Sequence, residues 1–99
     1  MVALVTEIRV RPSASIPFAD PSLESDRMEN GIRTWPGWIS GNTEFSEDGL
    51  TSTRIVKWES AEYYNNPTLT EDQILWNEKN IKWYKERDFI VTITIDSLD

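Results

Sequence analysis

The segment Arg33–Gly41 (RTWPGWISG) constrains the fold more than any other part of this chain, because it places a Pro-Gly pair between two tryptophans. A residue that precedes proline is pushed out of the helical region of backbone space, so a helix in this segment cannot extend past Trp35. Gly37 can then adopt a left-handed conformation and reverse the chain. The pair therefore predicts a junction at which a helix ends and a strand begins.

Hydrophobic periodicity predicts four strands along the chain. In each of them apolar side chains alternate with other residues, which is the pattern of an extended chain with one buried face. The predicted strands span 2–10, 38–46, 50–59 and 89–98. A turn at Asp48-Gly49 joins the two middle strands as a hairpin, because glycine accepts the left-handed position in such a turn.

Two helices are predicted between these strands. The first is expected to start near Ser22 and to end at Trp35. The second starts after Thr70, which is the predicted N-cap and forms a capping box with Gln73, and it is expected to end near Asp88. The order strand-helix-strand-strand-helix-strand is that of an α+β, ferredoxin-like fold, in which two helices cover one face of a four-stranded antiparallel sheet.

Apolar residues also occur on the second face of the predicted sheet. Leu4 and Ile8 belong to the main apolar row of the first strand, whereas Val5 lies on its opposite face. Ile90 lies opposite the main apolar row of the last strand. A sheet with two apolar faces needs a second cover, and the simplest one is the same sheet of another copy. We therefore expect a homodimer that associates through the sheet face.

Composition narrows the chemistry open to the single domain expected over residues 1–99. The chain has no cysteine and no histidine, which removes thiol nucleophiles, histidine bases and the common zinc and haem ligands. Its 17 acidic and 10 basic side chains give a net charge of -7, which opposes binding to nucleic acid and to anionic membrane surfaces. Charged residues interrupt the apolar start of the chain, so no signal peptide or membrane helix is expected and the expected location is cytoplasmic.

The stretch PGWISGNTEFSEDGLTSTRIVKWESAEYY, residues 36–64, resembles the antibiotic biosynthesis monooxygenase-like family of the dimeric α+β barrel superfamily. The shared pattern is a Pro-Gly pair, a strand, an Asp-Gly turn, a second strand and a Trp-Glu-Ser sequence. A Trp-Tyr pair late in the second helix, here Trp83-Tyr84, extends the likeness over the whole chain. The resemblance implies a dimeric ferredoxin-like barrel. The superfamily includes cofactor-independent quinol oxygenases, haem-degrading enzymes, and dehalogenating and isomerising enzymes.

Three departures from the pattern of the haem-degrading members argue against that activity. The haem-degrading members have a histidine on the second helix as the iron ligand, a tryptophan shortly after the Trp-Glu-Ser sequence and an asparagine on the first strand. Asn77 and Pro67 stand at the first two positions here, and Thr6 and Glu7 occupy the region of the third. Quinol-oxidising members need no cofactor, because the anion of the substrate itself activates oxygen. No cofactor is therefore expected, and the sequence shows no metal-ligand cluster.

The second predicted helix carries most of the candidate site. At about 100° per residue, one half of its circumference is charged and the other half is mainly aromatic and aliphatic. Asn77 and Asn80 interrupt the apolar half, and a buried amide without a partner costs about 1–3 kcal/mol. Each amide should therefore bond to backbone, water or a ligand. The candidate substrate-binding residues are Trp76, Asn77, Asn80, Trp83 and Tyr84, with Tyr64 and Asn65 at the rim.

Two classes of function remain open at this point. In the first, the helix lines a pocket for a small aromatic substrate, and the protein is a monooxygenase-like enzyme or binding domain. In the second, the same aromatic residues form the core or the interface of a non-enzymatic dimerisation or assembly module, and 63–67 is a turn. A ligand-sensing regulatory subunit is a third interpretation, which requires a partner domain.

No catalytic residue is assigned from the sequence. Without histidine or cysteine, a general base would have to be an aspartate, a glutamate or an activated tyrosine. Glu7, Arg9 and Glu59 are interpreted as surface or interface charges. The proline-rich segment 12–21 either folds over the pocket as a lid or crosses the surface, and crossing the surface is the expectation.

Overall fold

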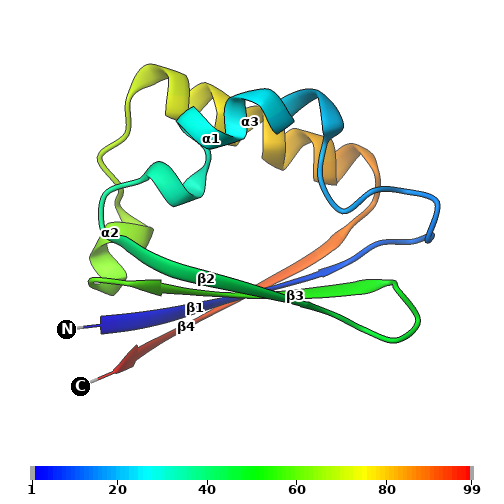
Figure 1. Ribbon diagram of the computed structural model, residues 1–99, viewed down its shortest axis with the longest axis horizontal. Coiled ribbons are helices and arrows are strands. Elements are labelled where there is room, and N and C mark those ends of the chain that lie inside the picture. Colours follow the sequence, from blue (N-terminus) through cyan, green and yellow to red (C-terminus); the bar gives the residue numbers. More distant parts are fainter. Residues whose placement is uncertain (1, 99) are drawn as a thin grey trace.

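The computed structural model describes residues 2–98, and its four strands form one antiparallel sheet (Figure 1). The strands are β1 (Val2–Val10), β2 (Trp38–Phe45), β3 (Thr51–Trp58) and β4 (Ile90–Leu98). They lie in the order β2-β3-β1-β4, and every pair of neighbours is antiparallel. This arrangement confirms the predicted ferredoxin-like fold class.

The helical layer lies over one face of the sheet (Figure 1). It consists of α1 (Glu24–Asn30) and α3 (Glu71–Glu86), while the short helix α2 (Ala61–Asn65) lies at one end of the sheet. Two 3-10 turns, Pro21–Leu23 and Ile32–Thr34, flank α1. Within residues 2–98, no helix is long and apolar enough to span a bilayer.

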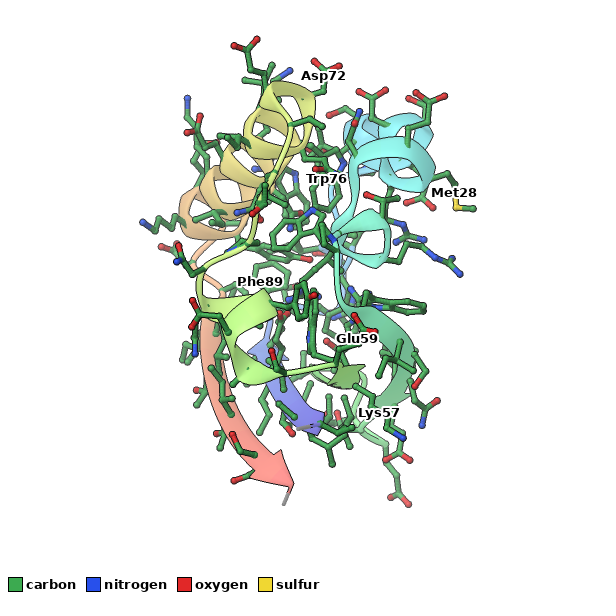
Figure 2. The ribbon with its side chains drawn as sticks, turned by 90° about the vertical axis from the view of Figure 1, so that its left-hand side faces the viewer. Met28, Lys57, Glu59, Asp72, Trp76 and Phe89 are labelled. Atoms are coloured by element: carbon green, nitrogen blue, oxygen red, sulfur yellow. The ribbon has the colours of Figure 1, made fainter. Side chains whose placement is uncertain are left out.

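The first helical region is shorter and more broken than the prediction of one helix from Ser22 to Trp35. Gly31 has an extended backbone, with φ -70° and ψ 171°, and it separates α1 from the 3-10 turn that follows. A Cβ atom at Gly31 would lie 2.4 Å from the carbonyl oxygen of Arg27, so only glycine permits this close approach. Met28 of α1 points outward and is 65% exposed (Figure 2).

The start of α3 is as the sequence predicts. Thr70 is the N-cap, its side chain accepts a hydrogen bond from the backbone N–H of Gln73, and the Gln73 side chain accepts one from the backbone N–H of Thr70. This capping box is complete because both partners are three residues apart on the first helical turn. The helix ends at Glu86, two residues before the expected end at Asp88.

The face of β1 that meets the helices is the opposite of the one expected. Ala3 and Val5 are 0% and 1% exposed, and they belong to the row that lies beneath the helical layer. Val5 stands opposite Val56 on β3, and Ala3 stands opposite Trp58, so this row of β1 enters the core beside two buried side chains of β3. The row that contains Leu4 lies on the outer face of the sheet. The prediction that placed Val5 on the second face was therefore wrong.

The proline-rich segment 12–21 is anchored at the end of the sheet opposite α2 (Figure 1). The ring of Phe18 lies 5.4 Å from that of Phe45 and beneath the guanidinium of Arg11, at 3.9 Å. The hydroxyl of Tyr84 donates a hydrogen bond of 2.6 Å to the carbonyl oxygen of Phe18. The segment therefore closes one end of the space between the sheet and the helices.

The Pro-Gly junction is present as predicted, and it makes Gly37 irreplaceable by a larger residue. Gly37 has φ +87°, and a Cβ atom there would lie 2.3 Å from Cγ of Tyr63. We expect Gly37→Ala to lower the free energy of unfolding by at least about 2 kcal/mol, because left-handed strain and a steric clash combine. Urea unfolding measures this loss.

Gly49→Ala is the matched control for that substitution. Gly49 also has a positive φ, +72°, but the nearest atom to its Cβ position is Nη2 of Arg11 at 3.6 Å, which is an ordinary contact. We expect Gly49→Ala to lower the free energy of unfolding by only about 1 kcal/mol, from backbone strain alone. Equal losses in the two variants would contradict the role given to the contact between Gly37 and Tyr63.

Candidate functional site

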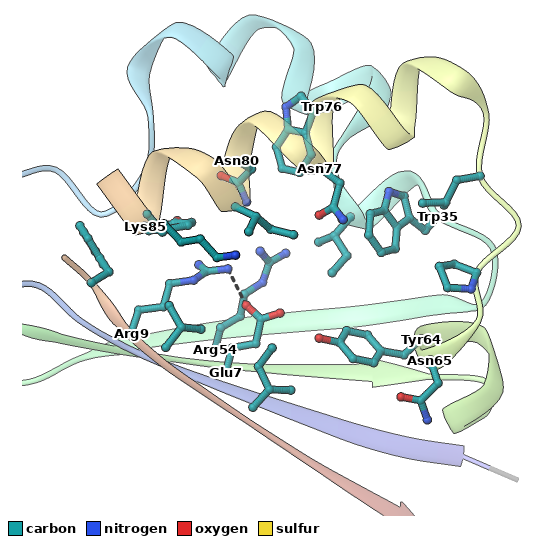
Figure 3. Close-up of a pocket in the computed structure, with 18 residues that line it drawn as sticks. Glu7, Arg9, Trp35, Arg54, Tyr64, Asn65, Trp76, Asn77, Asn80 and Lys85 are labelled. Carbon is teal, nitrogen blue, oxygen red and sulfur yellow. Dashed lines mark hydrogen bonds and ion pairs between the residues drawn. The ribbon is translucent and has the colours of Figure 1, made fainter. Parts of the chain in front are cut away.

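A cavity of about 650 Å³ lies between α3 and the sheet (Figure 3). Strands β1, β3 and β4 form its floor, α3 forms its roof, and α2 lies at one end. Its aromatic lining residues are Trp35, Tyr64, Trp76, Tyr84 and Phe89. This volume and this lining are typical of sites that enclose a small organic ligand.

Two aromatic clusters lie toward the two ends of the space between the helices and the sheet. At the α2 end, the ring of Trp58 lies 6.4 Å from that of Trp35 and 5.6 Å from that of Tyr64. At the other end, the rings of Tyr84 and Phe89 are 4.9 Å apart. Both clusters contribute rings to the cavity lining, Trp35 and Tyr64 from the first and Tyr84 and Phe89 from the second.

Most of the residues predicted as substrate-binding line this cavity. Those that do are Trp76, Asn77, Asn80 and Tyr84 from α3, and Tyr64 and Asn65 from α2. The segment 63–67, which was interpreted as a turn, is partly helical, because α2 extends to Asn65. Trp83 does not line the cavity, because it packs against Phe89 at 5.5 Å and beneath the guanidinium of Arg87 at 4.5 Å. The role of these residues in binding stays a prediction.

The two amides on α3 have unused hydrogen-bonding capacity. Among residues 2–98, no side-chain hydrogen bond joins Asn77 or Asn80 to another residue. Both side chains are half-buried and extend from α3 toward the floor of the cavity, where Glu7 and Arg54 lie (Figure 3). Amides that fixed a neighbouring loop would show partners there. Their geometry therefore favours the pocket interpretation over the structural one.

Sequence reasoning missed the charged floor of the cavity. Glu7 is only 6% exposed, and its carboxylate accepts a hydrogen bond from Nη2 of Arg9, so the interpretation of these two residues as surface or interface charges was wrong. Arg54 stands opposite Glu7 in the register of β1 and β3, and Lys85 enters from α3. Alternation along β3 puts Arg54 on the face of Val56 and Trp58. The alternation along β3, combined with the register of β1 and β3, would have placed Arg54 and Glu7 on the buried face of the sheet.

The cavity has a positive local charge in an acidic protein. Arg9, Arg54 and Lys85 line it, and Glu7 is the single carboxylate among its lining residues. Within residues 2–98, Arg54 forms no ion pair. Burial lowers the pKa of Arg54, yet a guanidinium stays protonated at neutral pH. Positive groups of this kind favour the ionised form of an acidic ligand that binds beside them.

The two tyrosines of the cavity are hydrogen-bond donors and not bases. Burial raises the pKa of Tyr64 to about 12, and burial also raises the pKa of Tyr84. Both phenols are therefore protonated at neutral pH, and the hydroxyl of Tyr84 is already bonded to the carbonyl oxygen of Phe18. Glu7 is the remaining group that could accept a proton from a ligand.

Metal binding has no support in the arrangement of acidic residues. Among residues 2–98, no three Asp or Glu side chains gather closely enough to hold an ion. Arg9 forms an ion pair with the carboxylate of Glu7. Arg54 and Lys85 remain as further positive groups in the cavity, which suits an organic anion better than a metal cation.

No sequence-family model matches the chain, and no curated protein matches it by sequence. Solved structures match over nearly its full length. SnoaB from Streptomyces nogalater, a cofactor-independent oxygenase, is 10% identical with a TM-score of 0.60, and the match covers 99% of this chain and 92% of SnoaB. An ethyl tert-butyl ether d (EthD) family protein from Bacillus halodurans is 13% identical with a TM-score of 0.58, and the match covers 100% of both chains.

A third similar structure contains a ligand. It is the monooxygenase from the gene ActVA-Orf6 of Streptomyces coelicolor in complex with Nanaomycin D, which is 15% identical with a TM-score of 0.52 over 99% of this chain and 88% of the other. Identities this low establish the fold and leave the activity to be argued from the site. The chain therefore has the fold of the antibiotic biosynthesis monooxygenase-like proteins, as the resemblance of its sequence implied.

Proposed function

We propose that this protein is a cofactor-independent monooxygenase-like enzyme that binds a small aromatic substrate in the cavity beneath α3. The observation that carries the proposal is the combination of aromatic walls, unpaired amides and a positively charged floor. Trp76 and Tyr64 offer surfaces for a flat ring, and Asn77 and Asn80 offer donors and acceptors for its oxygen substituents. Two structural neighbours are an oxygenase and a monooxygenase, which is consistent with this function.

The chemistry that fits the cavity begins with loss of a proton from a phenol or quinol. Glu7 is positioned to accept that proton, and Arg54 is positioned to stabilise the anion that forms. The anion can transfer electrons to dioxygen, after which oxygen bonds to a ring carbon that carries one hydrogen. Conversion of the phenol to a quinone then consumes one dioxygen, breaks the phenolic O–H bond and one C–H bond, and releases one water. The step balances without a metal or an organic cofactor.

The same proposal includes a homodimer that associates through the outer face of the sheet. Alternation places Leu4 and Ile8 of β1 on this face, with Ile55 of β3 and Ile90 of β4, which are 40% and 65% exposed. Thr6, Thr53 and Thr94 lie between these residues, and Lys57 and Asp96 flank Leu4 on the same face. A second copy offers the same surface, and two such faces can pack across a two-fold axis.

A thermal-shift screen tests binding with phenols, quinols and polycyclic ketones as probes. A ligand at 100 times its dissociation constant stabilises the native state by about 2.7 kcal/mol, which raises the melting temperature of a domain of this size by several degrees. We expect Asn80→Ala to weaken the binding of any such compound at least tenfold and to change the unfolding free energy by under about 0.5 kcal/mol.

Asn66→Ala is the matched control for the binding test. Asn66 bonds to Glu62 at the end of α2 and does not line the cavity. It should leave ligand affinity unchanged. If no compound stabilises the wild type and Asn80→Ala lowers the unfolding free energy by about 1–2 kcal/mol, the amide is structural and the proposal fails.

A further inference from the structure

A second cavity, of about 230 Å³, lies between the α1 region and β2 and has an unusual charge. Its polar lining residues are Arg27, Arg33, Arg54, Trp38 and Thr43, and none of its lining residues is acidic. The chain as a whole has 17 acidic and 10 basic side chains. Three guanidinium groups gathered around one cavity in such a chain repel one another unless an anion lies among them.

Two residues that line this cavity, Trp38 and Arg33, carry hydrogen-bond donors that lack strong partners within residues 2–98. The indole Nε1 of Trp38 is buried and unpaired. A Cβ atom at Gly41 would lie 3.9 Å from that nitrogen and 3.4 Å from Cζ2 of the same ring, so the glycine keeps the space beside the indole open. Arg33 lies over the Trp38 ring at 5.7 Å, and its polar contact is a weak one of 4.0 Å to the sulfur of Met28.

Only one of the three arginines is neutralised in this part of the chain. Arg27 forms an ion pair of 3.0 Å with Glu24, and both side chains are about half exposed, so the pair lies toward solvent. Neither Arg33 nor Arg54 forms an ion pair with another residue among 2–98. Arg54 also lines the cavity beneath α3, as do Ile32 and Trp76, so the two cavities adjoin.

We propose that this second cavity binds a small oxyanion, a carboxylate or phosphate group, through Arg27, Arg33 and Arg54, with the indole N–H of Trp38 and the hydroxyl of Thr43 as further donors. A guanidinium donates two parallel hydrogen bonds to such a group, and a buried indole N–H needs an acceptor. The anion is either an acidic substituent of the aromatic molecule in the adjoining cavity or a separate ion. The site itself does not depend on oxygenase activity.

The first test is a titration of the wild-type protein with inorganic phosphate at constant ionic strength, followed by the indole N–H signals in ¹H–¹⁵N NMR spectra. Trp38→Phe identifies the signal of Trp38 by its loss. We expect phosphate to shift that signal saturably and to leave the indole signals of the tryptophans outside this cavity nearly unchanged. We expect Arg33→Gln, at an exposed position outside the main cavity, to weaken this binding at least tenfold.

Arg87→Gln is the matched control, because Arg87 lies over Trp83 on α3 and lines neither cavity. It should change phosphate affinity less than twofold. Equal weakening by Arg33→Gln and Arg87→Gln would show non-specific attraction and would overturn the proposal. Thermal melts of all three variants confirm that each is folded at the temperature of the titration.

A second experiment compares the affinities of 2-naphthoate and of the neutral 2-naphthamide for the protein, followed by the same indole signals. If the oxyanion belongs to the aromatic ligand, the acid binds at least tenfold more tightly than the amide, shifts the Trp38 signal and loses that advantage in Arg33→Gln. If the oxyanion is a separate ion, phosphate and the amide bind independently. Failure of both phosphate and 2-naphthoate to shift the Trp38 signal overturns the proposal, even where 2-naphthamide binds. Phosphate binding without any aromatic binding would refute the proposed function alone.

Discussion

Glu7→Gln is expected to lower the rate of oxygen uptake with a bound phenol or quinol by a factor of about 10² to 10⁴, the usual contribution of a general base. Glu7 is the single carboxylate in the cavity, and its two neighbouring tyrosines are held in the protonated form. Glutamine preserves the shape of the side chain and can still accept a hydrogen bond from Arg9. The affinity for the substrate should therefore change by less than about threefold.

Glu59→Gln is the control for this substitution. Glu59 is an exposed carboxylate directly after β3 and does not line the cavity, so its removal alters the net charge of the protein equally. It should leave the rate unchanged. If Glu7→Gln retained the full rate, or if both variants lost activity together, Glu7 would not be the base. Thermal melts should accompany the assay, because Arg9 loses a charged partner in Glu7→Gln.

Ile55→Lys is expected to convert the proposed homodimer into a monomer. Ile55 lies on the outer face of β3, opposite Thr6 of β1, and is 40% exposed in the single chain. Two-fold symmetry would introduce two ammonium groups into the interface, and each unpaired buried charge costs several kcal/mol. The dissociation constant should rise at least about a hundredfold, which multi-angle light scattering measures as a halved mass.

Leu75→Lys separates this effect from a general change in charge. Leu75 is 49% exposed and belongs to α3, away from the outer face of the sheet. This variant should remain dimeric. A wild-type protein that is monomeric at all accessible concentrations, or an Ile55→Lys variant with unchanged mass, would contradict an interface on the sheet.

Local sequence patterns predicted the elements that depend on neighbouring residues. The Pro-Gly pair placed the start of β2, Asp48-Gly49 placed the hairpin, and the capping box of Thr70 placed the start of α3. In each case one backbone conformation is strongly favoured by two or three adjacent residues. The same local patterns set the order of strands and helices along the chain, and that order is typical of a ferredoxin-like fold.

The features that the sequence did not reveal depend on contacts between distant residues. Both faces of β1 carry apolar side chains, so alternation alone could not show that Val5 and Glu7 face the helices. The register with Val56 and Trp58 decides that orientation. The helical wheel of α3 found the amides Asn77 and Asn80, but the charges beneath them come from other strands and become neighbours only in the folded sheet.

Oxygen uptake by the wild-type protein, with a compound that binds saturably in the thermal-shift screen, tests the proposed function most directly. The measurement uses protein freed of metals by a chelator and no added flavin, haem or nicotinamide. We expect uptake of one dioxygen for each molecule of quinone formed, at a rate that saturates with the compound. Uptake no faster than in buffer alone, at a concentration that fills the cavity, would contradict the proposed function.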